Sequence, residues 1–344
     1  MVKRISLLLS LLGVVVGIGA PSACVPDSSF SPASTLLPTI ANAPSWEDSR
    51  SSIPPGKRLV MGWDNDTPGF IGGSTYQIAA GDTLTGTFHI LSQYEREQRL
   101  LWTMIVDGMQ VEFTVEGEET LLFPTHLGPG AETSFAFETP PLAEGFHNIT
   151  FICFLDYDNH GPESDGRRML MFPSALSNVW SGDVVPVPTA APNPSLQRDN
   201  AIASGCGIWL SQDRFESASD AKNRLQWTAE PGERLDYFTH TTGSEREAAT
   251  GIALIAFLDY HQVPLQVGDP VRPLVSLIAP GEQGVAACSL IVPQEEGPHE
   301  LQVARIDSID RPFSTITQTD QAGRYRSFSI LTSQRVLLEV RPGG

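Results

Sequence analysis

Two ten-residue stretches decide the fold, MIVDGMQVEF at Met104–Phe113 and AFLDYHQVPL at Ala256–Leu265. Each leads from an apolar run into an Asp-x-x-Gln-Val phrase, which is typical of a tight hairpin between two strands. The second stretch repeats Asp107 and Gln110-Val111 of the first as Asp259 and Gln262-Val263. The same residues in the same order predict two copies of one hairpin.

The repeat extends over most of the chain, with a period near 151 residues. Matched phrases keep their order, and their separations run only from 150 to 157 residues. Chance matches would not stay collinear over such a length, so we infer that one domain was duplicated. The other matched phrases are Tyr76–Leu84 with Trp227–Leu235, Glu95–Glu97 with Glu245–Glu247, Pro129-Gly130 with Pro280-Gly281, Gly145–His147 with Gly297–His299, Gly166-Arg167 with Gly323-Arg324, and Val179 with Val336.

Each copy has the pattern of short β-strands. Apolar residues alternate in 133–139, where Phe135 and Phe137 share a face, and in the matching stretch 285–293. Residues 100–106 and 252–258 are continuously apolar, which predicts central strands covered on both sides. We therefore expect an all-β chain with two tandem antiparallel β-sandwiches of seven to nine strands each, and no long amphipathic helix.

The Gly-x-His phrase followed by alternating apolar residues resembles the penultimate strand of bacterial immunoglobulin-like domains. The tryptophan between two cysteines that defines antibody domains is missing, so the resemblance is at the level of the fold. It implies an immunoglobulin-like architecture and no particular activity. We place the two sandwich domains at residues 56–180 and 201–344, joined by a proline-rich linker at 181–200.

The first segment has the layout of a secretory signal peptide. Residues 1–23 begin with Lys3 and Arg4, continue with an uncharged apolar run at 5–20, and end in small residues. Ser22-Ala23 before Cys24 resembles the lipobox of bacterial lipoproteins, which implies that Cys24 is lipidated and holds the protein in the cell envelope. Residues 24–55 are rich in Ser, Pro and Ala and predict a flexible tether. The alternatives are release after cleavage at Ala23 or an uncleaved anchor helix.

Composition excludes several classes of protein. The chain has 344 residues and a net charge of −18, which argues against nucleic acid as a partner and leaves the lipid anchor as the expected membrane contact. An apolar content of 41% is too high for a disordered chain. Four cysteines without a CxxC pair support neither a disulfide scaffold nor a zinc site.

Two kinds of polar residue invite a functional interpretation. His147 and His299 recur in the repeat, but no nucleophile stands at a recognisable spacing, so we expect partly buried rings bonded to nearby backbone. Oxygen-rich loops suggest a weak calcium site in the first domain alone. Turn formation explains these residues equally well, so we expect no metal and no cofactor. The calcium candidates are Asp64, Asp66, Asp156 and Asp158.

Cysteines and tryptophans leave two alternatives each. Cys206 and Cys288 lie in the same copy and could form a disulfide, with Cys153 buried and free, or all three could be small core residues. Trp63, Trp180 and Trp209 lie at the ends of domains and could stack on sugars or pack in the core.

No catalytic motif is present: the chain lacks G-x-S-x-G, H-E-x-x-H and a P-loop. We therefore expect an exported, lipid-anchored cell-surface protein with a non-enzymatic role in binding, adhesion or scaffolding. Its partner would be an extracellular protein or a polysaccharide. The alternatives are a carbohydrate-binding module, an extracellular enzyme with a site in its loops, and a pure spacer.

Overall fold

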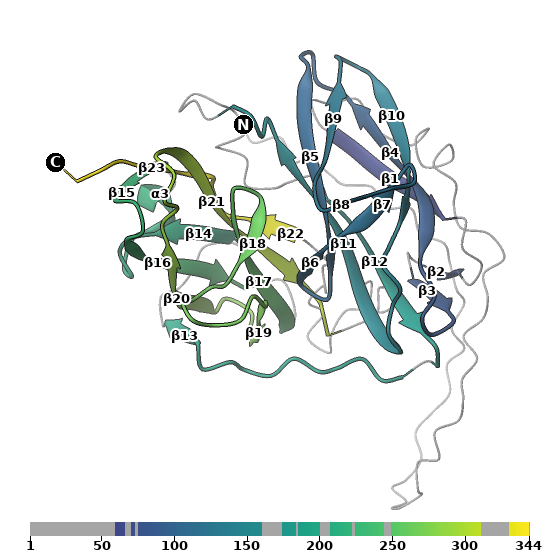
Figure 1. Ribbon diagram of the computed structural model, residues 1–344. Helices are drawn as coiled ribbons and strands as arrows, with labels where there is room; N and C mark the ends of the chain where they lie inside the picture. The colour runs from purple at the N-terminus through teal and green to yellow at the C-terminus, as the bar shows by residue number, and fades with distance from the viewer. Residues whose placement is uncertain are drawn as a thin grey trace, which may run out of the picture. The chain divides into compact units, whose positions relative to one another are not determined.

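The computed structural model describes residues 59–65, 70–72, 75–159, 174–183, 185–199, 207–221, 224–243, 249–310 and 330–343. Almost all regular structure in these residues is β-strand, arranged in four sheets (Figure 1). The predicted all-β class and antiparallel sheets are confirmed. The one helix in the described ranges, α3, is a single turn at Ala218–Ala221. The expected signal peptide, tether and Cys24 lie outside the described residues.

The first sandwich, purple to teal in Figure 1, consists of two sheets that face each other across one apolar core. One sheet has the order β1 (Leu59–Asn65), β4 (Thr85–Ser92), β10 (Glu132–Glu138), β7 (Phe113–Val115), β8 (Glu118–Thr120). The other has the order β2 (Phe70–Gly72), β3 (Thr75–Ile78), β12 (Ser174–Ser181), β11 (Gly145–Leu155), β5 (Gln98–Val106), β6 (Met109–Val111), with β9 (Phe123–Leu127) also paired to β5.

The second sandwich is built in the same way. Its smaller sheet has the order β13 (Leu196–Asp199), β20 (Gln283–Ile291), β16 (Arg234–Thr242), β14 (Gly207–Ser211). Its larger sheet has the order β15 (Gln226–Ala229), β23 (Val336–Val340), β21 (Gly297–Asp307), β17 (Thr250–Leu258), β18 (His261–Val263), with β19 (Leu274–Ile278) paired to β17 and β22 (Ile330–Thr332) paired to β21.

The two sandwiches share the order of their central strands, as a duplication requires. In the larger sheet of each, a short strand runs parallel to the last strand, β3 beside β12 and β15 beside β23. Two antiparallel pairs correspond as well: β11 with β5 matches β21 with β17, and β10 with β4 matches β20 with β16. The smaller sheets differ at one edge, where β7 pairs with β10 in the first sandwich and β13 pairs with β20 in the second. Strand counts in the described residues, twelve before the linker and eleven from β13 on, exceed the predicted seven to nine because several are three-residue pieces.

Part of the expected linker belongs to the second sandwich. Residues 196–199, which the proline content assigned to the spacer, form β13 and pair with β20. Just before them, Asn193 donates from its backbone N–H to Ser276 and from its side chain to the carbonyl of Val275. The four prolines fix extended backbone, and extended backbone beside a sheet edge can continue that sheet.

Buried faces follow the predicted alternation. Phe135 and Phe137 are both buried in the first core, and Cys288 is buried at the matching position of the second core. Strands β5 and β17 are buried on both faces, as their continuous apolar runs predict. One face of each strand packs into its own sandwich, and the other face packs against the other sandwich.

Candidate functional site

The outer faces of the two larger sheets meet in a third apolar cluster, which we call the joint. The first sandwich contributes side chains from β5 and β11, and the second contributes side chains from β17, β21 and β22. Phe154 and Phe257 meet edge to face there, with ring centroids 5.5 Å apart. The buried joint residues are Leu101, Ile105, Ile152, Phe154, Ala253, Ile255, Phe257, Ala304, Ile306 and Ile330.

Two glutamines of the repeated phrase bond to each other across the joint. The backbone N–H of Gln110 donates to Oε1 of Gln262 over 2.6 Å, and the backbone N–H of Gln262 donates to Oε1 of Gln110 over 2.6 Å. The two side-chain amides complete the exchange: Gln110 Nε2 donates to the carbonyl of Tyr260, and Gln262 Nε2 donates to the carbonyl of Gly108, each over 2.9 Å. The repeated residues therefore recognise each other.

This exchange has the form of an isologous interface, in which each patch meets its own equivalent around a twofold axis. Gly108 and Tyr260 are 152 residues apart, as are Gln110 and Gln262. We call residues at this offset twins. Strand register supports the correspondence, because Leu101 lies opposite Phe154 in the first sandwich and its twin Ala253 lies opposite Ile306 in the second.

A His–Asp pair holds each hairpin turn behind the joint. His147 Nδ1 lies 2.6 Å from Asp107 Oδ2, and His147 Nε2 lies 2.7 Å from the carbonyl oxygen of Ala143. The other carboxylate oxygen of Asp107 accepts the backbone N–H of Asn148 over 2.8 Å. Asp107 adopts a φ of 52°, in the left-handed region, so these bonds stabilise a backbone conformation that few residues adopt freely.

The second copy repeats this arrangement. His299 Nδ1 lies 2.6 Å from Asp259 Oδ2, and its Nε2 lies 2.9 Å from the carbonyl of Glu295. Both rings therefore face an acceptor at each nitrogen, a geometry that only the doubly protonated imidazolium satisfies fully. The bond to Asp107 is the main cause that raises the pKa of His147. Burial acts to lower the pKa of His299, but the bond to Asp259 and the Glu295 carbonyl raise it overall.

The expected role of these histidines was structural, and the structure agrees with that interpretation in outline. Each ring is largely buried, and one nitrogen bonds nearby backbone. The partner of the other nitrogen is a carboxylate, which the sequence interpretation missed. The signal was present, because Asp107 and Asp259 recur in the repeat together with the histidines.

A buried ion pair closes one side of the joint. Arg335 and Glu300 are 0% and 1% exposed and bond through Nη2 and Nε of the guanidinium. Arg335 Nη1 reaches across to the carbonyl of Leu155 in the first sandwich over 2.6 Å. The hydroxyl of Tyr260 donates to the carbonyl of Tyr157 and lies 2.7 Å from Glu300. One charged cluster of the second sandwich therefore holds the end of β11 in the first.

The other side of the joint carries amides in place of charges. Asn148, the twin of Glu300, accepts a bond from Asn178 over 2.6 Å. Its Nδ2 donates across the joint to the carbonyl of Ile309 over 3.1 Å. Ile309 is the twin of Tyr157, so both sides use the same backbone acceptor with different donors. The Asn148 side chain therefore faces the joint, and the residue is 8% exposed.

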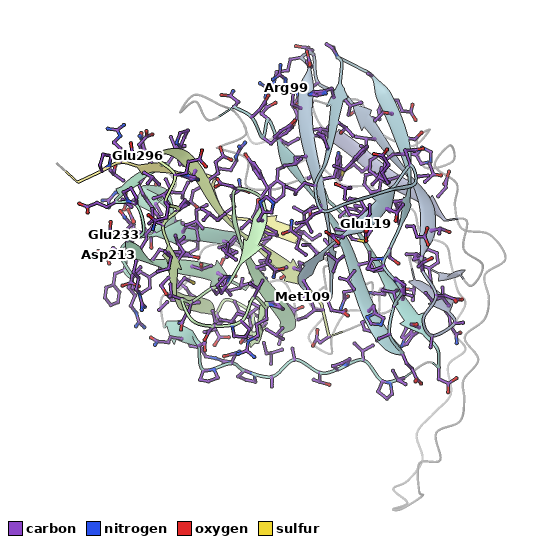
Figure 2. All side chains as sticks on the ribbon, in the orientation of Figure 1. Arg99, Met109, Glu119, Asp213, Glu233 and Glu296 are labelled. Atoms are coloured by element: carbon purple, nitrogen blue, oxygen red, sulfur yellow. The ribbon has the colours of Figure 1, made fainter. Side chains whose placement is uncertain are left out.

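Two of the calcium candidates pair with arginine side chains. Arg96 Nη2 lies 3.0 Å from Asp156 Oδ2, and Arg99 pairs with Asp158 in a polar hollow of about 390 Å³. Figure 2 shows Arg99 at one end of the β5–β6 segment and Met109 at the other. Asp64 lies 3.2 Å from His89 on the neighbouring strand, and Asp66 lies outside the described residues.

Two of the cysteines and two of the tryptophans singled out in the sequence are buried in the structure. Cys153 and Cys288 are buried free thiols, and burial raises the pKa of Cys288 to about 11. Cys206 lies outside the described residues. Trp180 and Trp209 are 4% and 6% exposed, and Trp209 stacks on His240 with ring centroids 4.9 Å apart. Both are thus shielded from a sugar ligand. Trp63 pairs with Phe88 through its backbone in β1.

No known protein family and no curated protein matches the chain. Solved structures match it at low identity. Red sea bream transglutaminase is 7% identical with a TM-score of 0.23, and the match covers 86% of this chain and 33% of the enzyme. A CARDB domain from Pyrococcus furiosus, 13% identical with a TM-score of 0.22, covers 36% of this chain and 87% of that domain.

A PapD-like domain of human CEP192 is 8% identical with a TM-score of 0.21, over 39% of this chain and 89% of that domain. The chain spans about a third of the transglutaminase and most of each smaller domain. No helix of the described part has the length and apolar character to cross a membrane.

Proposed function

We propose that this protein is exported, is anchored in the cell envelope through a lipid on Cys24, and presents its two sandwiches as one rigid head. The head would bind an extracellular protein or polysaccharide without catalysing a reaction. The reciprocal exchange between Gln110 and Gln262 is the observation that supports a rigid head, because these repeated residues bond the two sandwiches to each other.

Rigidity has a physical basis in the joint. An apolar cluster, four glutamine bonds and the bond from Arg335 to the carbonyl of Leu155 all cross it. Domains joined by a flexible linker alone move independently by default, whereas a large apolar interface suppresses that motion. A rigid head fixes the spacing of loops on both sandwiches, which suits the display of a composite binding surface.

The ionisable clusters of the described residues support a non-enzymatic role. His147, His299 and Glu300 each hold backbone or a charged partner in place. In the polar hollow, Asp156 and Asp158 each bond an arginine. These groups form structural contacts. A binding role is compatible with those contacts, because it does not require any of these side chains to act as an acid, a base or a nucleophile.

The anchor is tested by labelling cells that express the full chain with a radioactive fatty acid. We expect label in the wild-type chain and in the Cys206→Ser variant, and none in Cys24→Ser. The Cys206→Ser variant controls for the loss of a thiol elsewhere. Absence of label in the wild type, or label that survives in Cys24→Ser, would remove the anchor from the proposal. Protease treatment of intact cells tests display: the head should be cleaved while a cytoplasmic marker stays whole.

A further inference from the structure

A cavity of about 320 Å³ opens on the amide side of the joint. The first sandwich lines it with Gly108 and Asn148, and the second lines it with Ala253, Ile306 and Ile309. Ala190 of the linker segment borders it as well. Apolar side chains make up most of its wall. Its polar lining includes Asp107, Asn148 and Asp310, and the amide of Asn148 bonds the carbonyl of Ile309 there.

The twins of these residues surround a tyrosine side chain. Across the pseudo-twofold axis, Asn148 corresponds to Glu300, and Ile306 and Ile309 correspond to Phe154 and Tyr157. Each of these three twins contacts the Tyr260 side chain. Its hydroxyl bonds Glu300 and the Tyr157 carbonyl, and its ring lies 5.0 Å from that of Phe154. The space that is empty on the amide side therefore holds a phenol ring on the charged side.

Gly108 is the twin of Tyr260, so this position places no side chain in the cavity. Both residues have positive φ, 80° at Gly108 and 70° at Tyr260, so the two turns share a backbone conformation. A Cβ on Gly108 would lie 2.6 Å from Cγ of Pro273, which excludes a side chain there without movement of that ring. The amide side thus has the surroundings that hold a tyrosine ring on the charged side, but a side chain at position 108 cannot enter them without moving Pro273.

We infer that this cavity is a binding site for a small phenol. The ring would lie against Ala253 and Ile306, as the Tyr260 ring lies beside Phe154. The hydroxyl would donate to the carbonyl of Ile309, as Tyr260 donates to the carbonyl of Tyr157. Asn148 occupies one lone pair of the Ile309 carbonyl, and a carbonyl oxygen has two.

The size of the cavity fits one substituted ring. An apolar cavity of about 150 Å³ suffices to bind benzene in a protein core. The cavity of about 320 Å³ leaves room for a ring with a further small substituent. Binding here would fill space within the joint, so it would raise the stability of the joined sandwiches, whether or not the protein is exported.

The probe for this site is 4-methylphenol, which has the ring and hydroxyl of a tyrosine side chain. Isothermal titration of the purified full chain without residues 1–23 should give one site per chain. Toluene, which lacks the hydroxyl, should bind between about twofold and tenfold more weakly, because one hydrogen bond is lost. Equal affinity for the two would refute the hydrogen bond to Ile309, and no heat with 4-methylphenol at millimolar concentration would refute the site as a whole.

Two variants fill the cavity with side chains larger than those of the occupied side. Ile306→Trp exceeds its twin Phe154 in size, and Ala253→Phe exceeds its twin Leu101. Each should reduce 4-methylphenol binding at least about tenfold while the β-rich circular dichroism spectrum is kept. Ile330→Trp, a change to the same large side chain at a joint residue outside the cavity wall, should leave binding unchanged. Binding that survives both filling variants, or that falls equally in the control, would contradict the assignment.

Discussion

Replacing Gln262 by alanine removes two bonds of the joint at once. The variant loses the bond from Gln262 Nε2 to the carbonyl of Gly108 and the bond from the Gln110 backbone N–H to Gln262 Oε1. A hydrogen bond contributes about 1 kcal/mol, and a shielded polar group left without a partner costs about 1–3 kcal/mol. These partners are only partly buried, so we expect the free energy of unfolding to fall by about 2–4 kcal/mol.

The assay is equilibrium unfolding in urea, followed by tryptophan fluorescence, with Gln266→Ala as the matched control. Gln266 makes one bond, from Nε2 to the carbonyl of Ala287, within its own sandwich and near solvent. That variant should lose less than about 1 kcal/mol. Native-state hydrogen exchange adds a local measurement, because the amide of Gln110 loses its acceptor only in Gln262→Ala. A local loss of about 2 kcal/mol corresponds to roughly thirtyfold faster exchange.

The reasoning would be refuted if Gln262→Ala and Gln266→Ala destabilised the chain equally and the Gln110 amide kept its exchange rate. The twin variant Gln110→Ala gives a second measurement of the same quantity. It removes the acceptor of the Gln262 backbone N–H and the donor to the Tyr260 carbonyl. The free energy of unfolding should fall in Gln110→Ala by the same amount as in Gln262→Ala, within about 1 kcal/mol, since both variants remove the same two types of bond.

Three further outcomes follow from the structure. The raised pKa values of His147 and His299 stabilise the fold fully below the ordinary value of 6.5, and this stabilisation is lost as pH rises through the raised values. Thermal unfolding between pH 5 and 9 should therefore show a decline that flattens when both histidines are replaced by glutamine, and an unchanged profile would contradict the assignment. Arg335→Met leaves Glu300 buried without its cation and should cost about 3–5 kcal/mol in urea unfolding, whereas changing both residues to asparagine, the amide pair of the other copy, should recover at least about 2 kcal/mol. Burial raises the pKa of the Cys153 thiol well above 9.0, so iodoacetamide should not label this thiol in the native chain but should label it in urea. Peptide mapping measures the labelling, and rapid labelling of Cys153 in the native chain would contradict its burial.

The architecture could be predicted because burial dictates local pattern. Alternating residues such as Phe135 and Phe137 belong to a strand with one buried face, and period two is visible in any single sequence. The joint also left a signal: 100–106 is apolar at odd and even positions, and Leu101 and Ile105 face the other sandwich while Trp102 and Met104 face their own core. The sequence therefore predicts that both faces of this strand are covered, but it does not predict that the other sandwich covers the outer face.

The ion pair of the joint was beyond sequence reasoning. Arg335 and Glu300 are 35 residues apart, and only the pairing of β23 with β21 brings them together. The repeat gives no help there, because the twin of Glu300 is Asn148, which bonds Asn178 and no arginine side chain in the described part of the first copy. The partners of Asp156 and Asp158 could not be predicted either, because Arg96 and Arg99 lie about sixty residues away in the sequence.

Residual dipolar couplings of the full chain without residues 1–23, measured in a dilute aligning medium, test the central claim most directly. Two sandwiches locked by Gln110 and Gln262 form one body, so the amides of 75–155 and of 250–307 should fit a single alignment tensor. Separate tensors of different magnitude for the two segments would mean that the sandwiches reorient independently, and the joint described here would then not hold in solution.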